Sequence, residues 1–183
     1  SDVIVSPLSF HPGVGPSLNV WTDEEGRYEF AGFGPYEWPL LFKRHGYPAH
    51  WSGGTGNRHQ ATKIRVMAGD TVTHDEALTA GTEVTGTFTN QDGVSADYGY
   101  VLAHNAVTGD IVGVSWFENG RYSMPVLGRQ RIYFSYDVSF GEDYYSGTFP
   151  TPRSMSTGGP RHTKVFRVPP TGSLTVNIVI QTD

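Results

Sequence analysis

The side chains best suited to bind another molecule are aromatic residues set in polar loops. Trp51 is typical, because it lies in residues 50–57 (HWSGGTGN), a stretch too polar to bury every side chain in it. Aromatic rings on a rigid rim beside Asn, Asp and Arg side chains can stack on the apolar faces of sugar rings. The alternative is that Trp51 and Tyr145 close the open ends of the fold as core residues. The candidate sugar-binding residues are Trp38, Tyr47, Trp51, Asn57, Tyr144 and Tyr145.

Metal chemistry would have to come from histidines and carboxylates, because the chain has no cysteine. His45, His50 and His59 flank the same loop, and three converging His nitrogens about 2 Å from the ion can hold a catalytic zinc. These residues lack the His-x-x-x-His spacing of a helical zinc site. We therefore interpret them as surface residues and predict neither a metal nor a cofactor.

No motif in the chain supports nucleophilic or acid–base catalysis. Ser115 lacks the second glycine of a G-x-S-x-G elbow and lies on a predicted strand. Carboxylate pairs such as Glu24 and Glu25 lie in turns, where solvated acids are the usual state. The sequence contains neither a P-loop nor a G-x-G-x-x-G motif ahead of a helix. We therefore predict that the protein is not an enzyme.

The composition excludes several classes of protein. The charge of 13 Lys and Arg minus 18 Asp and Glu is −5, with no basic run, so we predict no binding to nucleic acid. No apolar run approaches the roughly 20 residues that span a bilayer, so we expect no membrane insertion. Aromatic residues make up 13% of the 183, too many for a disordered chain, and 23 Gly and 12 Pro are too many for a helical bundle.

The elements that must position these residues are short strands separated by turns. In residues 83–88, Val84 and Phe88 fall on one face, as a half-buried strand requires. Asn119-Gly120 between apolar runs indicates a hairpin with a type I′ turn, in which both central residues have positive φ. Further predicted strands include 27–30, 72–77 and the two that hold Trp21 and Trp116, which we place in the core.

One pattern of residues occurs twice in the chain. Residues 23–34 read DEEGRYEFAGFG, and residues 117–128 read FENGRYSMPVLG. Tyr28 and Tyr122 fall at the same place in the two copies, two residues after a turn glycine. A buried ring at this position stabilises a sandwich by a few kcal/mol, so we assign both tyrosines to core packing.

The repeat continues in the second half of each copy. Residues 71–78 (TVTHDEAL) align with residues 173–180 (SLTVNIVI), and each stretch follows a turn led by glycine. We therefore predict two tandem β domains, residues 1–80 and residues 81–183, each large enough for a core of its own. The first domain is shorter ahead of its hairpin.

The second copy has the outline V-x-G-x-F-x-x-x-D-G, then an N-G-R-Y hairpin, an L-G turn and a Y-Y-S-G loop. It resembles the carboxypeptidase regulatory-like domain, a prealbumin-like or Cna-B-like β-sandwich that occurs in tandem in secreted bacterial, especially actinobacterial, proteins. The resemblance implies an all-β chain of two tandem Ig-like or prealbumin-like antiparallel β-sandwiches, normally without catalysis. Some Cna-B relatives form a Lys–Asn isopeptide bond. Asn177 lies on the last strand here, but residues 83–88 contain no Lys, so we exclude that bond.

These expectations describe a secreted or cell-surface bacterial protein that binds without catalysis. The favoured ligand is a polysaccharide or surface glycan, held by the loop aromatic residues. The alternative is a structural spacer or adhesion stalk with a protein partner. A third candidate, proteinase inhibition, would present Arg153 or Met155 on the loop 150–159 (PTPRSMSTGG).

Overall fold

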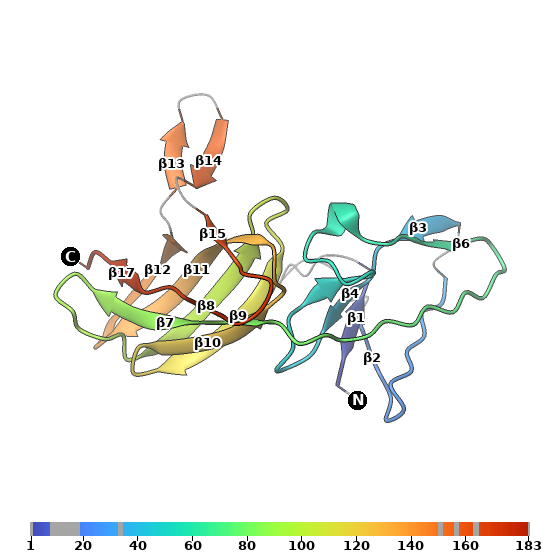
Figure 1. Cartoon of the computed structure of the whole chain (residues 1–183), viewed down its shortest axis with the longest axis horizontal. Coiled ribbons are helices and arrows are strands. Elements are labelled where there is room, and N and C mark those ends of the chain that lie inside the picture. Colours follow the sequence, from blue (N-terminus) through green and yellow to red (C-terminus); the bar gives the residue numbers. More distant parts are fainter. Residues whose placement is uncertain are drawn as a thin grey trace. The chain divides into compact units, whose positions relative to one another are not determined.

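The computed structural model describes residues 2–7, 19–32, 35–149, 152–155, 158–162 and 165–182 (Figure 1). The chain divides into two compact units, Ser1–Ala80 (unit 1) and Gly81–Asp183 (unit 2). Across the described ranges the regular structure is β-strand, apart from one short 3-10 helix, η1 (Arg58–Gln60). The predicted all-β class is confirmed. Nowhere in these ranges is there a helix long and apolar enough to cross a membrane.

Unit 2 is built of two sheets and a separate two-stranded ribbon. Its strands are β7 (Thr82–Asn90), β8 (Tyr98–Asn105), β9 (Ile111–Glu118), β10 (Arg121–Val126), β11 (Arg131–Phe140), β12 (Asp143–Phe149), β13 (Pro152–Met155), β14 (Gly158–His162), β15 (Phe166–Arg167), β16 (Ser173–Thr175) and β17 (Ile178–Ile180). One sheet is antiparallel with the order β12-β11-β8-β9, and β15 pairs with β11. The other has the order β10-β7-β16, and β17 also pairs with β7, while β13 and β14 form the ribbon.

The second sheet of unit 2 departs from the antiparallel arrangement that we expected. β10 runs antiparallel to β7, but β16 and β17 run parallel to it. A parallel pair needs a long connection between its strands, and here the rest of unit 2 supplies that connection. β7 is therefore the central strand of this sheet, with a neighbour on each side.

The core of unit 2 lies between its two sheets. β7 contributes Val84 and Phe88, which are fully buried on one face, as the alternation predicted. The Phe88 ring meets the ring of Tyr136, from the opposite sheet, edge-on at a centroid distance of 5.0 Å. Burying a side chain of this size stabilises the fold by roughly 1.5–3 kcal/mol.

The hairpin between β9 and β10 has the turn that its sequence predicted. Asn119 and Gly120 have φ values of 58° and 64°, both positive as a type I′ turn requires. Gly120 is also needed for space, because a Cβ there would lie 2.7 Å from the carbonyl oxygen of Phe88.

Unit 1 has one antiparallel four-stranded sheet of shorter strands. Its strands are β1 (Ile4–Ser6), β2 (Val20–Trp21), β3 (Tyr36–Trp38), β4 (Leu41–Lys43), β5 (His50–Trp51) and β6 (Ile64–Val66). The sheet order β2-β1-β4-β5 has the same sequence of neighbours as β9-β8-β11-β12 in unit 2, while β3 and β6 form a ribbon. Val5, Leu40 and Phe42 are buried on this sheet, and Tyr28 and Phe30 pack against them.

Two predicted strands of unit 1 are wrong, because residues 27–30 and 72–77 belong to no strand. The aligned segments of unit 2 are β10 and β16–β17, and they are strands because both pair with β7. A strand needs a neighbour to satisfy its backbone N–H and C=O groups. Among the described residues of unit 1, no segment pairs as β7 does in unit 2. Of the two sheets of the predicted sandwich, only the one that corresponds to β9-β8-β11-β12 therefore forms among these residues.

Candidate functional site

The outer face of the β12-β11-β8-β9 sheet carries a group of aromatic side chains, of which Tyr98, Trp116 and Tyr144 are exposed and Tyr100 is half-buried. On β8, Val101 and Ala103 point into the core, so Tyr98 and Tyr100 point outward. The strand register places Trp116 of β9 opposite Tyr100 on one side and Asp137 of β11 on the other. We call this surface the aromatic face and define it as Tyr98, Tyr100, Trp116, Asp137 and Tyr144.

Trp116 is the most exposed ring of the aromatic face, with 75% of its surface accessible. Its predicted place in the core is therefore wrong, and so is that of Trp21 on β2 of unit 1, which is exposed as well. For Trp116 the cause is a register irregularity between β8 and β9 near Ala103, after which Gly113, Ser115 and Phe117 point inward. A bulge of this kind shifts the alternation by one residue and moves every later side chain to the other face.

The rings of the aromatic face form two neighbouring pairs. The centroids of Tyr100 and Trp116 lie 5.1 Å apart, and the planes are tilted by 57°. Tyr98 and Tyr144 meet edge-on at 6.1 Å, and their hydroxyl groups are hydrogen-bonded to each other. Tyr98 and Tyr100 are two residues apart on β8, about 7 Å along the strand. Their partners lie on opposite sides of β8, Trp116 on β9 and Tyr144 on β12 beyond β11.

Polar groups accompany these rings. The Tyr100 hydroxyl donates a hydrogen bond to Oδ2 of Asp137 at 3.5 Å. Desolvation and the nearby Asp137 carboxylate raise the pKa of Tyr100, and the hydrogen bond with Tyr98 raises the pKa of Tyr144. Tyrosine phenols are protonated at neutral pH, and a raised pKa keeps these two protonated to higher pH, so both can donate as well as accept hydrogen bonds. The aromatic face thus combines apolar ring surfaces with hydroxyl and carboxylate groups.

The structure corrects the role of Trp51, which was the leading candidate for an exposed platform. Only 1% of its surface is accessible, because β5 pairs with β4 and turns the indole into unit 1. The backbone of Trp51 also closes its own loop, exchanging two hydrogen bonds with Thr55. The alternative interpretation, a core plug, is the correct one. Tyr145 also faces the core, but it is only half-buried. It lies on the core side of β12, edge-on to Phe140 at 5.9 Å.

The other predicted residues are not brought together into one site. Trp38 is half-buried on β3, edge-on to Tyr36 at 5.9 Å. Tyr47 is exposed. The guanidinium carbon of Arg44 lies over the Tyr47 ring, 5.2 Å from the ring centre. Asn57 caps η1, accepting a hydrogen bond from the backbone N–H of His59 at 2.9 Å, which is a structural role. Of the six predicted residues, only Tyr144 belongs to the aromatic face.

The predicted surface position of the histidines is wrong for His50, which is buried in unit 1. Its ring is stacked on Phe42 at 5.9 Å, and its Nε2 lies 3.4 Å from Oε1 of Glu76. Oε2 of Glu76 lies 3.2 Å from Nε2 of His74. The same carboxylate accepts hydrogen bonds of 3.0 Å from the backbone N–H groups of Gly53 and Gly54.

This His50–Glu76–His74 cluster holds the 50–57 loop against the rest of unit 1, so its evident role is structural. His45 and His59 are exposed, as predicted. Within the described part of the chain, no group of three His, Cys, Asp or Glu side chains is arranged to hold a metal ion.

The loop predicted to present Arg153 or Met155 to a proteinase contributes β13 and the start of β14. These strands pair as an antiparallel ribbon in which Arg153 is opposite Arg161. The side chains of this ribbon, and residues 150, 151, 156 and 157, lie outside the described residues.

The chain matches no known protein family, no curated protein and no solved structure. What it binds is therefore inferred from its own residues.

Proposed function

We propose that the protein binds a polysaccharide or surface glycan, without catalysis, through the aromatic face of unit 2. The observation that carries the proposal is the Trp116–Tyr100 pair, an exposed indole and a phenol whose centroids lie 5.1 Å apart. Sugar rings have apolar C–H faces that stack on such rings. Their hydroxyl groups bond to phenols and carboxylates, which Tyr100 and Asp137 provide beside the indole.

The layout of the aromatic face favours an extended polymer over a single sugar. A second ring pair, Tyr98 and Tyr144, lies diagonally across the sheet from the first, with Tyr98 about 7 Å further along β8, so successive sugars of a chain that crosses the face would meet successive pairs. Exposed apolar patches with polar rims are typical of interaction sites on soluble proteins. Because the binding surface is a sheet, its rings are already in position before a ligand arrives, which limits the entropic cost of binding.

We further propose that the two units are copies of one carboxypeptidase regulatory-like domain. The matching sheet orders support this, and so does a repeated hydrogen bond. The Tyr28 hydroxyl donates to the carbonyl oxygen of His74 at 2.9 Å, and the Tyr122 hydroxyl donates to that of Val176 at 2.6 Å. His74 and Val176 are aligned in the sequence repeat. Tandem domains of this kind occur in secreted bacterial proteins, so the proposed location is outside the cell or at its surface.

Retention on insoluble cellulose, xylan, chitin, starch and peptidoglycan tests the binding proposal. We expect the wild-type protein to be retained on one of these polymers. Trp116→Ala should bind that polymer more weakly by a factor of about ten or more. Trp21→Ala is the matched control, because Trp21 is also highly exposed, at 64%, but lies in unit 1. It should bind as the wild type does.

Two results would refute polysaccharide binding by the aromatic face. Retention that survives Trp116→Ala would move the site elsewhere. Absence of retention on every polymer would favour the alternative, a spacer or adhesion stalk with a protein partner. Circular dichroism of each variant establishes that it is folded.

A further inference from the structure

The charged groups on and beside the aromatic face are carboxylates. Asp137 of β11 lies opposite Tyr100 of β8, and Glu118, at the end of β9, lies opposite Tyr98. Residues directly opposite each other on antiparallel strands have Cβ atoms about 4.5–5.5 Å apart on the same face of the sheet. Each of the two tyrosines of β8 therefore has a carboxylate beside it, and the two carboxylates lie on opposite sides of β8.

The Trp116–Tyr100 pair is flanked by both carboxylates. Asp137 is the next residue across the sheet from Tyr100, whose hydroxyl donates a hydrogen bond to it at 3.5 Å. Glu118 is exposed and lies two residues from Trp116 along β9, about 7 Å away on the same face. A sugar stacked on this ring pair would therefore have a carboxylate within reach on two of its sides.

No basic side chain balances these carboxylates within the described residues. The outward-facing positions around the rings are 98, 100 and 102 on β8, 114, 116 and 118 on β9, 135, 137 and 139 on β11, and 144, 146 and 148 on β12. None of them is Lys, Arg or His. In the described part of the chain, Asp137 and Glu118 form no ion pair.

His104 is the next outward residue of β8, and it is bonded elsewhere. Its Nε2 lies 2.7 Å from Oγ of Ser135, and its Nδ1 lies 3.1 Å from the carbonyl oxygen of Gly109. The negative charge beside the rings is therefore available to a ligand.

This charge distinguishes between classes of polysaccharide. A polymer with carboxylate or sulfate groups would bring like charges against Asp137 and Glu118, which is unfavourable. A neutral polymer would gain only ring stacking and hydrogen bonds. A polymer with protonated amino groups would also gain charge-assisted hydrogen bonds to the carboxylates and cation–π contacts with the Trp116 ring. The third class therefore gains the most from this surface.

We infer that the aromatic face is selective for polysaccharides of aminosugars whose amino groups are free, such as polymers of glucosamine. The inference rests on the proposed function, because it names the class of glycan that the aromatic face binds. One sugar would stack on Trp116 and Tyr100, with its ammonium group beside Asp137. An ammonium group of a neighbouring sugar would lie beside Glu118. Acetylation of the amino groups removes their charge, so an acetylated polymer would bind more weakly.

Two oligosaccharides that differ only in acetylation test this selectivity. Oligomers of glucosamine and of N-acetylglucosamine, of equal length, are titrated into the whole protein by calorimetry. A pH of about 5.5 lies between the ordinary pKa values of carboxyl and amino groups, so both carry charge. The glucosamine oligomer should bind about tenfold more tightly or better. Raising the salt concentration from about 0.05 M to about 0.5 M should lower this ratio of affinities several-fold.

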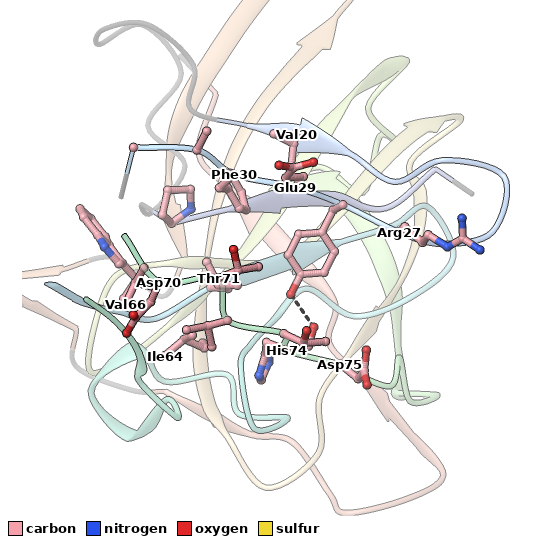
Figure 2. Close-up of a pocket in the computed structure, with 18 of the residues that line it drawn as sticks. Val20, Arg27, Glu29, Phe30, Ile64, Val66, Asp70, Thr71, His74 and Asp75 are labelled. Atoms are coloured by element: carbon pink, nitrogen blue, oxygen red, sulfur yellow. Dashed lines mark hydrogen bonds between the residues drawn. The ribbon is translucent and has the colours of Figure 1, made fainter. Parts of the chain in front are cut away.

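A pair of double variants locates the selectivity. Asp137→Asn combined with Glu118→Gln removes both carboxylates and should lower the ratio of the two affinities about tenfold. Glu29→Gln combined with Asp70→Asn is the matched control, because it removes the same charge from exposed positions of unit 1, both labelled in Figure 2. It should leave the ratio unchanged. Circular dichroism establishes that both double variants are folded.

The outcomes separate this inference from the proposed function. Equal affinity for the two oligomers, with binding lost in Trp116→Ala, would overturn the selectivity and leave glycan binding by the aromatic face in place. A ratio that persists without Asp137 and Glu118 would overturn it as well. So would failure of both oligomers to bind. In that case, retention on cellulose, xylan or starch that Trp116→Ala abolishes would preserve the proposed function, and absence of retention would refute both.

Discussion

Units 1 and 2 use aligned positions of the chain in different ways. At the position of Ile178, which is fully buried and pairs with β7 in unit 2, unit 1 has Glu76. The Glu76 carboxylate lies beside two histidines and accepts hydrogen bonds from two backbone N–H groups. At the position of Val176 unit 1 has His74. Unit 2 gains its stability from the apolar side chains of a central strand, whereas unit 1 satisfies polar groups at the same places.

The difference shows how much a sheet depends on one strand. Residues 27–30 carry the same alternation as β10, but without β7 beside them they form no strand. In unit 2, β7 adds Val84 and Phe88 to the core, and both are fully buried. Variants that remove one stabilising side chain or hydroxyl group from each unit therefore test the difference between the units.

The largest effect is expected from Phe88→Ala. The ring is fully buried and contacts Phe117 and Tyr136, so its loss should lower the free energy of unfolding of unit 2 by about 3–5 kcal/mol. Urea unfolding followed by the amide resonances of unit 2 measures the change. Val94→Ala, at an exposed position of the same unit, is the control and should change stability by less than about 0.5 kcal/mol. A loss of less than about 1 kcal/mol for Phe88→Ala would contradict the central role of β7.

Glu76→Ala should be the corresponding change in unit 1. It removes a carboxylate that accepts hydrogen bonds from Gly53 and Gly54 and lies 3.4 Å from Nε2 of the buried His50, so we expect a loss of about 2 kcal/mol. Hydrogen exchange of the 50–57 loop should accelerate with it. Glu24→Ala, in an exposed turn, should leave both properties unchanged. If the two variants behave alike, the polar cluster does not stabilise unit 1.

Removing one hydroxyl group from each unit compares the repeated hydrogen bond directly. Tyr122→Phe leaves the Val176 carbonyl oxygen without this donor in a buried site and should cost about 1–2 kcal/mol. Tyr28→Phe affects a half-buried bond and should cost about 0.5–1 kcal/mol. Equal costs would mean that the two bonds have the same surroundings, which would contradict the difference in burial between the two units.

The smallest effect is the alkaline sensitivity of unit 1. Burial, with Asp75 and Glu76 nearby, raises the pKa of Tyr28 to about 12 from its ordinary value of 10.0. The folded state therefore disfavours the tyrosinate, and the stability due to the protonated hydroxyl is present below about pH 10 and lost as the pH rises towards 12. The urea midpoint of unit 1 should fall over this range more steeply in the wild type than in Tyr28→Phe. Parallel pH profiles would refute this assignment.

Short-range patterns were sufficient to predict several features of the fold. The Asn119-Gly120 dipeptide predicted its turn because positive φ is a property of those residues themselves. The spacing of Val84 and Phe88 predicted their shared face because alternation is a local property of a strand. The strands at 27–30 and 72–77 were mispredicted because a strand also needs a partner that these segments do not contain.

The candidate site was harder to predict, because it depends on register. β9 has large apolar residues at both parities, Val112 and Trp116 on one and Phe117 on the other, so alternation alone does not say which face is buried. The irregularity near Ala103 decides it and turns Trp116 outward. The prediction of Trp51 as an exposed platform was wrong because it relied on the polarity of the loop. The pairing of β5 with β4 buries the Trp51 ring although the residues around it are polar. The D-Y-G-Y sequence of residues 97–100 was the available signal, since it puts two tyrosines on one face.

The most direct test of the proposed function is the fluorescence of Trp116 during titration with soluble fragments of cellulose, xylan, chitin, starch and peptidoglycan. In a Trp21→Phe background, Trp116 is the highly exposed indole that remains in the described part of the chain. We predict a saturable change in its emission with fragments of one polymer, which disappears in Trp116→Phe. An emission unchanged by every fragment, or a change that persists in Trp116→Phe, would contradict glycan binding by the aromatic face.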